Sequence, residues 1–231
     1  MRSLCFSLAI SFSFIGLIPV GASAQGGSAR RAAQLEARVA ALEEILRFVR
    51  VEFEPINGLT GPHWIFEGAN VHVRSGSGST HPCFDRPICA ESSGLGNLVV
   101  GYNEAIPSAP RIRHGTHNLI VGPEHSYRSS GGFVAGRHNS VWGQSASVTG
   151  GVGNRALGEN ASISGGELNI ASGTSSSVSG GFDNWARGDF SSVSGGFDNW
   201  ARGDFSSVSG GSGRTAPADN NWAAGSLLEA N

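Results

Sequence analysis

The feature that most constrains this chain is a repeat of 15 residues that begins at Gly132. The last two full units, Ser177–Ser191 and Ser192–Ser206, are identical. Three columns recur at this spacing: Val148, Ile163, Val178, Val193 and Val208; Asn139, Asn154, Asn169, Asn184 and Asn199; Gly143, Gly158, Gly173, Gly188 and Gly203. Such self-similarity predicts stacked coils, each of which contacts only its neighbours.

Each unit divides into two short extended runs, S-V-S-G-G and N-x-A-x-G. Because side chains alternate along a strand, Val178, Asn184 and Ala186 are expected to point inward. Trp185 and Arg187 then lie on the outer face. The recurring glycines are expected in tight turns that need a positive φ, and a repeated Asn column can form a hydrogen-bonded ladder. Paired glycines and β-branched residues oppose a helix.

The motif also occurs outside the regular units. Asn97–Gly101 and Asn118–Gly122 precede Asn139–Gly143 at spacings of 21 residues, and Asn221–Gly225 follows. These segments are interpreted as coils with larger turns, in which the pattern continues in weaker form. The predicted fold is mainly β: a parallel β-roll or solenoid over residues 94–225, with residues 226–231 as a tail.

The coils are thin, because Val178 and Ala186 are the clear inward apolar groups of one unit. So little apolar area does not offset the conformational entropy lost on ordering a whole coil. A coil therefore needs neighbours above and below it, and neighbouring chains alongside are expected too.

A short coiled-coil helix is predicted over residues 25–53. Its a positions are Ala32, Val39, Leu46 and Phe53, and its d positions are Leu35, Leu42 and Val49. In a parallel coiled coil Arg31 faces Glu36 of the neighbouring chain. Arg38 faces Glu43 in the same way, which favours parallel homo-oligomers. The alternative is an amphipathic helix that packs on its own domain, and Pro55 is expected to follow its end.

Residues 1–24 read as a secretory signal peptide. Leu8–Val20 is the apolar region, and Ala22-Ser23-Ala24 is a small-x-small cleavage site that leaves Gln25 as the first mature residue. The alternative is a membrane anchor, but the run is shorter than the ~20 residues of a spanning helix. The mature chain is expected to have no transmembrane segment and to be secreted or on the cell surface.

Two cysteines lie in the predicted connecting segment, residues 54–93. Cys83 and Cys89 are expected to form a local disulfide after export. The alternative is a metal site that adds His81, although this spacing lacks the usual second ligand pair.

The composition excludes some function classes. A formal net charge of −2 leaves no basic footprint for nucleic acid. No metal-binding or catalytic motif is found, so no cofactor, metal or catalytic residue is predicted. His114, Glu124 and His125 could be combined into a site, but nothing in the sequence fixes their geometry. Asp183 and Asp198 hint at calcium, but not at the spacing of calcium-binding rolls.

The most site-like feature is a set of aromatic residues beside arginines. Trp185, Trp200 and Trp222 are assigned to one outward column, with Arg187 and Arg202 next to it. Exposed aromatic patches mark interaction sites, so the column is a candidate platform for a glycan or a partner protein. The alternative is that the tryptophans are buried between chains. The sequence also contains Arg187-Gly188-Asp189 and Arg202-Gly203-Asp204, the tripeptide of integrin-recognition loops.

The units S-V-S-G-G-x-x-N-x-A-x-G resemble the head repeats of trimeric autotransporter adhesins, closely over residues 132–211 and loosely over 94–225. The resemblance implies a left-handed parallel β-roll of three chains side by side. The period here is one residue longer than the family's commoner one, and the coiled coil precedes the roll instead of following it. These departures leave autotransport unsupported.

The expected function is that of a non-enzymatic, homotrimeric, extracellular structural protein with an adhesive role. One alternative is a glycan-binding β-solenoid that uses the aromatic column. Another is an enzyme on a parallel β-helix, although the strands carry Ser and Gly where clustered carboxylates would be needed.

Overall fold

The computed structural model describes residues 24–80, 93–105 and 111–225. They fall into two compact units, one ending at Val71 and the other beginning at His72. The predicted signal peptide and the predicted Cys83–Cys89 disulfide lie outside the described residues. Among the described residues, no helix is both long enough and apolar enough to cross a membrane.

The first unit contains one helix and one hairpin. Helix α1 spans Ala24–Leu46, and strand β1 (Val49–Glu52) pairs antiparallel with β2 (His63–Phe66). The prediction that the helix continues to residue 53 is wrong: Val49 lies opposite Phe66 in the hairpin. Val49 and Val51 are β-branched and alternate with Arg50 and Glu52, and this pattern favours a strand once a partner strand is present.

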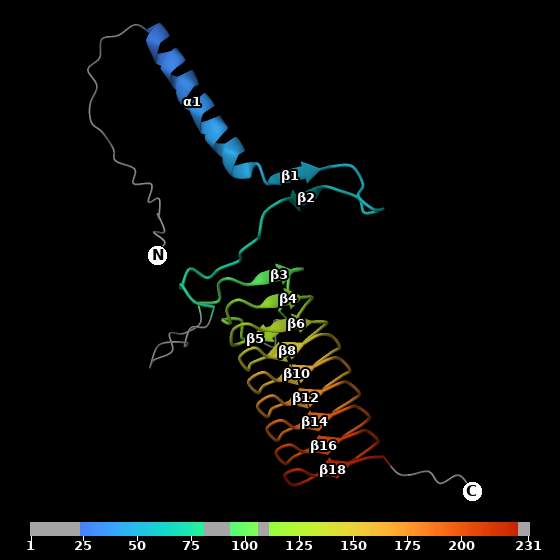
Figure 1. Cartoon of the computed structure of the whole chain (residues 1–231). Coiled ribbons are helices and arrows are strands. Elements are labelled where there is room, and N and C mark those ends of the chain that lie inside the picture. Colours follow the sequence, from blue (N-terminus) through green and yellow to red (C-terminus); the bar gives the residue numbers. More distant parts are fainter. Residues whose placement is uncertain (1–23, 81–92, 106–110, 226–231) are drawn as a thin grey trace. The chain divides into compact units, whose positions relative to one another are not determined.

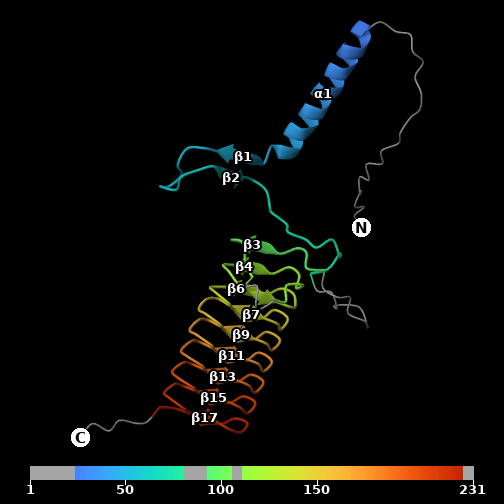
Figure 2. The same ribbon diagram turned by 180° about the vertical axis from the view of Figure 1, so that it is seen from behind.

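The second unit is a parallel β-solenoid of about seven coils, as predicted. Its first sheet has nine strands: β3 (Leu98–Val100), β4 (Leu119–Val121), β6 (Phe133–Ala135), β8 (Ser147–Val148), β10 (Ser162–Ile163), β12 (Ser177–Val178), β14 (Ser192–Val193), β16 (Ser207–Val208) and β18 (Trp222–Ala223). Its second sheet has seven: β5 (Ser126–Tyr127), β7 (Ser140–Val141), β9 (Arg155–Ala156), β11 (Ile170–Ala171), β13 (Trp185–Ala186), β15 (Trp200–Ala201) and β17 (Thr215–Ala216). From β8 onward Figure 1 labels the strands of the first sheet, and Figure 2 labels β7 to β17 of the second.

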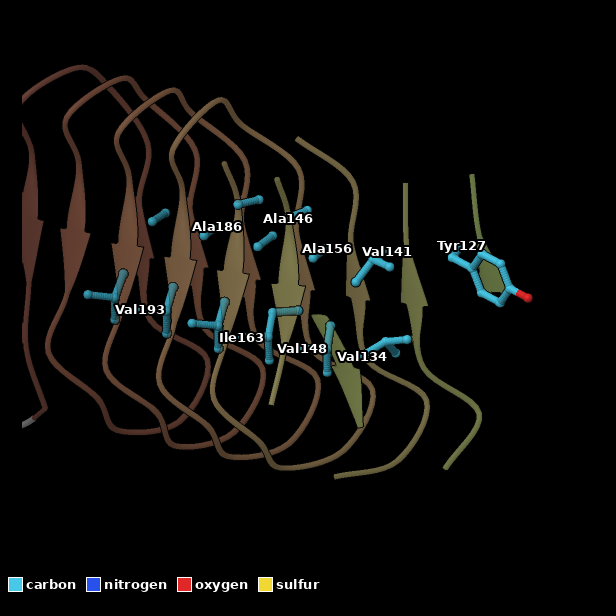
Figure 3. Close-up of a cluster of buried hydrophobic side chains, with 14 of the residues drawn as sticks. Tyr127, Val134, Val141, Ala146, Val148, Ala156, Ile163, Ala186 and Val193 are labelled. Carbon is cyan, nitrogen blue, oxygen red and sulfur yellow. The ribbon is translucent and has the colours of Figure 1, made fainter. Parts of the chain in front are cut away.

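The strand register confirms the repeat. Ser162 pairs with Ser177 and Val178 with Val193, each 15 residues apart. Valine and isoleucine from the first sheet face alanines from the second across a core one side chain deep on each side (Figure 3). The fully buried members include Val148, Ile163 and Ala186. The predicted alternation is therefore confirmed.

The Asn column is a continuous buried ladder. The Oδ1 of each of Asn139, Asn154, Asn169 and Asn184 accepts the backbone N–H of the Asn one coil on, at 2.7–3.1 Å. The Nδ2 of Asn169 donates to the carbonyls of Gly165 and Gly181 at 3.1 and 2.9 Å. Each buried amide thus joins successive coils and has its own donor and acceptor groups satisfied.

The outlying motifs do not belong to this ladder. Leu119 pairs with Phe133, so Asn118 aligns with Gly132 in the first sheet. Asn118 instead forms a second, shorter ladder, in which its N–H donates to Asn97 Oδ1 at 2.8 Å. At the other end Trp222 pairs with Ser207, which places Asn221 in the first sheet as well. The same Asn-containing motif lies in different sheets in different parts of the chain. The reason is that the lengths of the turns, rather than the motif, set the strand register.

The predicted positive φ is confirmed for the glycines that end the S-V-S-G-G runs, such as Gly166, Gly181 and Gly196. The column that contains Gly173 is glycine for a different reason. Gly173 does not have a positive φ; that conformation belongs to Ser175 in the same turn, at φ 54°. A Cβ on Gly173 would instead overlap the backbone of Gly188 in the next coil. The column is therefore glycine because successive turns approach one another too closely for any side chain.

We expect Gly173→Ala to destabilise the solenoid by roughly 3 kcal/mol, because backbone overlap cannot be relieved by a rotamer change. The matched control is Gly165→Ala, where a Cβ would meet nothing within 4 Å and the change should be neutral or slightly stabilising. Denaturant unfolding of both variants measures the difference. Equal stabilities would contradict this account of the column.

Candidate functional site

The predicted tryptophan column exists on the outer face of the second sheet, but with two members. Trp185 on β13 pairs in register with Trp200 on β15, and their rings stack with centroids 4.5 Å apart and planes at 17°. Each indole Nε1 donates to a carboxylate two residues earlier, Asp183 at 3.1 Å and Asp198 at 2.7 Å. These bonds hold both rings in one orientation.

The predicted arginines lie beside this pair. The Arg202 guanidinium is 4.9 Å from the Trp200 ring centroid, and that of Arg187 is 5.9 Å from Trp185 and 6.0 Å from Trp200. Such distances permit cation–π attraction.

The two rings of this pair cover one face of each other, and the arginines lie within cation–π distance of them. In register, Trp185 lies between Ile170 and Trp200, and Trp200 lies between Trp185 and Thr215. Both tryptophans are half-buried within a single chain. A sugar ring stacks on an aromatic face, so the geometry makes the pair a stabilising ladder more than an open platform.

Trp222 does not share this column, contrary to the sequence assignment. It lies on β18 of the first sheet, opposite Ser207, and its Nε1 donates to Ser209 Oγ at 2.7 Å. Its side chain is 68% exposed. The 15-residue spacing from Trp200 leads to Thr215 instead, which occupies the position that Trp222 was expected to take.

The stacked aromatic side chains that are most exposed in the repeats are phenylalanines near the turns. Phe182 stacks on Phe197 with centroids 5.7 Å apart, and Phe190 stacks on Phe205 at 5.1 Å. Their exposed fractions range from 40% to 61%. These two short columns therefore present more aromatic surface to solvent than the tryptophan pair does.

A column of aspartates, one from the same turn of each successive coil, was not identified from the sequence. The carboxylates of Asp189, Asp204 and Asp219 accept the N–H of Thr174, Asp189 and Asp204, respectively, at 2.7–2.8 Å. Their spacing of 15 residues was the available signal. The Asp of the first Arg-Gly-Asp tripeptide is thus one step of a stacked turn.

Asp183 and Asp198, the aspartates considered as calcium ligands, do not form a metal site in the described part of the chain. Asp183 and Asp198 accept hydrogen bonds from the tryptophans. Over residues 24–80, 93–105 and 111–225, no group of three or more His, Cys, Asp or Glu side chains could hold a metal ion. His81, Cys83 and Cys89 lie outside these ranges.

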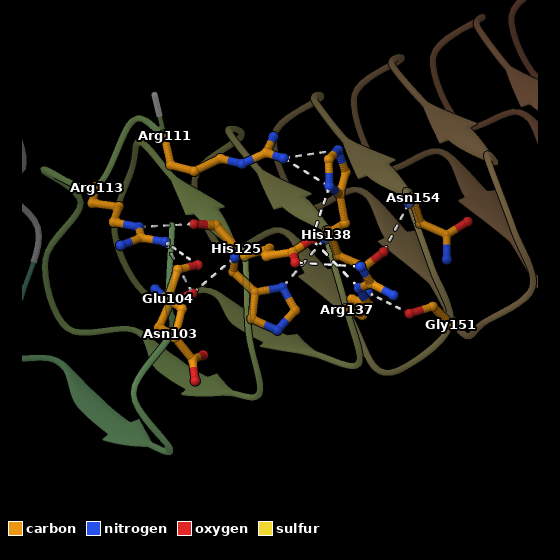
Figure 4. Close-up of polar contacts among 11 residues, drawn as sticks. Asn103, Glu104, Arg111, Arg113, His125, Arg137, His138, Gly151 and Asn154 are labelled. Atoms are coloured by element: carbon orange, nitrogen blue, oxygen red, sulfur yellow. Dashed lines mark hydrogen bonds and ion pairs between the residues drawn. The ribbon is translucent and has the colours of Figure 1, made fainter. Parts of the chain in front are cut away.

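A polar cluster lies on the first coils, shown in Figure 4. Glu124 accepts hydrogen bonds from Arg137 at 3.4 Å and His138 at 3.2 Å, and Arg111 contacts the His138 ring at 2.7 Å. Desolvation raises the pKa of Glu124, but the bonds from Arg137 and His138 outweigh it, and the pKa lies below its ordinary value. The site imagined from His114, Glu124 and His125 does not form, since His114 is exposed and His125 fully buried.

His125 is instead a member of the buried ladder, which the sequence did not reveal. The backbone N–H of His125 donates to Asn103 Oδ1 at 2.8 Å, and its ring Nδ1 accepts the backbone N–H of Asn139 at 3.2 Å. Its Nε2 lies 3.0 Å from the Val121 carbonyl, which assigns the neutral Nε2–H tautomer. Burial lowers the pKa of His125, and the nearby Arg113 guanidinium lowers it further, while its backbone hydrogen bonds oppose the shift.

The chain matches no protein-family model, and searches of curated proteins and of solved structures return no match. The likeness to adhesin heads therefore stays a likeness of sequence pattern. Function is inferred below from the residues and contacts of this chain alone.

We expect the free energy of unfolding to fall as the pH is lowered through about 6.5, the ordinary pKa of His. Unfolded His125 binds a proton there, whereas the folded ladder needs its neutral Nδ1 as an acceptor, so stability is present above this pH and lost below it. His125→Asn supplies a ladder acceptor that does not titrate. Denaturant unfolding at pH 7.5 and 5.0 should show a smaller pH effect in His125→Asn; an equal effect would contradict the assignment.

A double-mutant cycle tests the tryptophan ladder. Trp185→Ala and Trp200→Ala should show a coupling energy of about 1 kcal/mol, because stacked aromatic pairs contribute beyond their buried area. Trp185→Ala with Trp222→Ala is the matched control pair and should be additive, since Trp222 lies on the other sheet. Coupling of the same size in both pairs would show that the ladder contact is not its source.

Proposed function

We propose that this chain is a non-enzymatic structural protein of the cell exterior. Its N-terminal unit joins copies of the chain side by side, and its solenoid forms a rigid module that displays columns of side chains. One observation carries the proposal: the N-terminal unit has no core of its own.

No residue between Gly27 and Val71 is buried. Large apolar side chains on the helix and hairpin are exposed instead: Leu35, Val39, Leu42, Ile45, Leu46, Phe48, Val51, Phe53, Leu59, Trp64 and Phe66. A two-stranded hairpin is marginally stable by itself in water, and a helix gains most of its stability by packing an apolar face. This unit is therefore complete only when another surface covers it.

Charge complementarity favours further copies of the chain as that surface. In a parallel arrangement Arg38 of one helix faces Glu43 of the next, and Arg31 faces Glu36. The helical seam is shorter than expected, because Val49 has moved into the hairpin. The exposed apolar residues of the hairpin, such as Trp64 and Phe66, extend the apolar surface that association would bury.

The number of copies is proposed to be three, on the likeness of the repeats to trimeric adhesin heads. A location outside the cell is proposed from the signal-peptide pattern of residues 1–24. The glycan-binding alternative is not pursued, because it relied on the faces of Trp185 and Trp200. An adhesive role would fall to the exposed phenylalanine columns.

Light scattering on the mature chain is expected to give the mass of a trimer. Arg38→Glu should shift the mass towards monomer, because it places like charges opposite each other between helices. Combining Arg38→Glu with Glu43→Arg should restore the oligomer. Residues five apart do not face each other on one helix, so this rescue would report contact between chains.

Ala37→Glu is the matched control, since it adds the same charge at a position facing away from the seam and should leave the mass unchanged. A monomeric wild-type chain would overturn the proposal. So would an Arg38→Glu variant that dissociates no more than Ala37→Glu.

A further inference from the structure

The last coil of the second sheet departs from the repeat at three stacking positions. Aligned with the preceding unit, Arg214 stands where Asn199 stands, Pro217 where Arg202 stands and Ala218 where Gly203 stands. The same coil keeps Ser207, Val208, a glycine pair and Asp219 in their usual places, and it also replaces aromatic residues, with Thr215 where Trp200 stands. The three departures at stacking positions fall on groups that each coil uses to hold the next one.

The glycine position is the most restrictive. In each earlier coil a Cβ at this position would overlap the backbone of the following coil, as Gly188 shows with Gly203 and Gly203 with Ala218. Ala218 carries a real Cβ. A further coil stacked with the same geometry would therefore collide with it.

The second position removes a hydrogen-bond donor. The N–H of Arg187 donates to the Ala201 carbonyl at 2.8 Å, and that of Arg202 donates to Ala216 at 2.9 Å. Pro217 takes this place in the last coil and has no N–H to give. Proline on an edge strand is a known means of preventing further strand pairing.

The third position ends the asparagine ladder. Asn199 Oδ1 accepts the N–H of Arg214 at 2.9 Å, as each earlier Asn does from its successor. An arginine side chain has donors and no acceptor, so Arg214 cannot receive the N–H of another coil. The buried amide of a following coil would be left unsatisfied.

We propose that residues 207–221 form a terminating coil, which prevents any further coil from adding to the second sheet in register, whether from the same chain or from a second copy. The solenoid is thereby closed to end-to-end growth at β17. Its length is set by how many units precede this coil. This inference rests on the stacking geometry and is independent of the proposed function.

The test compares two full-length variants of equal composition. In one, an extra copy of residues 192–206 is inserted between Ser206 and Ser207, before the terminating coil. In the other, the same copy is inserted between Asn221 and Trp222, after it. Intact-mass hydrogen exchange counts the slowly exchanging amides of each variant.

We expect the first insertion to add the protected amides of one coil and to raise the thermal midpoint. The second should add none and lower the midpoint. Restoring the repeat in the second variant with Arg214→Asn, Pro217→Arg and Ala218→Gly should recover the protected amides. If the second variant fails to fold, recovery in the restored variant supports the proposal.

Two results would overturn the proposal. One is equal protection of the extra coil before and after residues 207–221. The other is a restored variant that gains no protected amides over its parent.

Discussion

The buried asparagine ladder is the interaction on which the solenoid depends. Each coil contributes little apolar volume, because its core consists of one valine or isoleucine, one alanine and small residues. Such a core cannot also leave backbone groups unpaired. The Asn side chain resolves this, since its oxygen accepts from the next coil while its nitrogen donates to turn carbonyls of two coils. One repeated side chain thus links successive coils and is itself fully hydrogen-bonded.

Close stacking also determines where chemistry can occur. Turns approach so closely that only glycine fits at positions such as Gly173, and the interior of the 15-residue units holds apolar side chains no larger than isoleucine. Larger groups are therefore confined to outward columns, where each one meets its equivalent in the next coil. Stacked Trp185–Trp200, Phe190–Phe205 and the Asp189–Asp204 bond are all consequences of that geometry. Any binding role would use linear arrays of side chains in place of a pocket.

The two units differ in how they satisfy the hydrophobic effect. The solenoid buries its valines and alanines by stacking, and residues 207–221 give that stack a defined end. The N-terminal unit leaves Leu42, Phe53 and Trp64 exposed and has no buried residue from Gly27 to Val71. Exposed apolar side chains of this extent mark a surface that takes part in an interaction, and they lie in the N-terminal unit.

The sequence by itself determined the solenoid, the 15-residue step and the inward or outward direction of Val178, Asn184 and Trp185, because strict periodicity leaves one consistent stacking. Only the tertiary structure decided which sheet receives each irregular motif. Trp222 was misplaced because hydrogen bonds between residues far apart in the chain set its register. For the same reason the sequence hid His125 in the ladder and the end of α1 at Leu46. Local patterns specify what a segment can form; its partners in space decide which of those forms it takes.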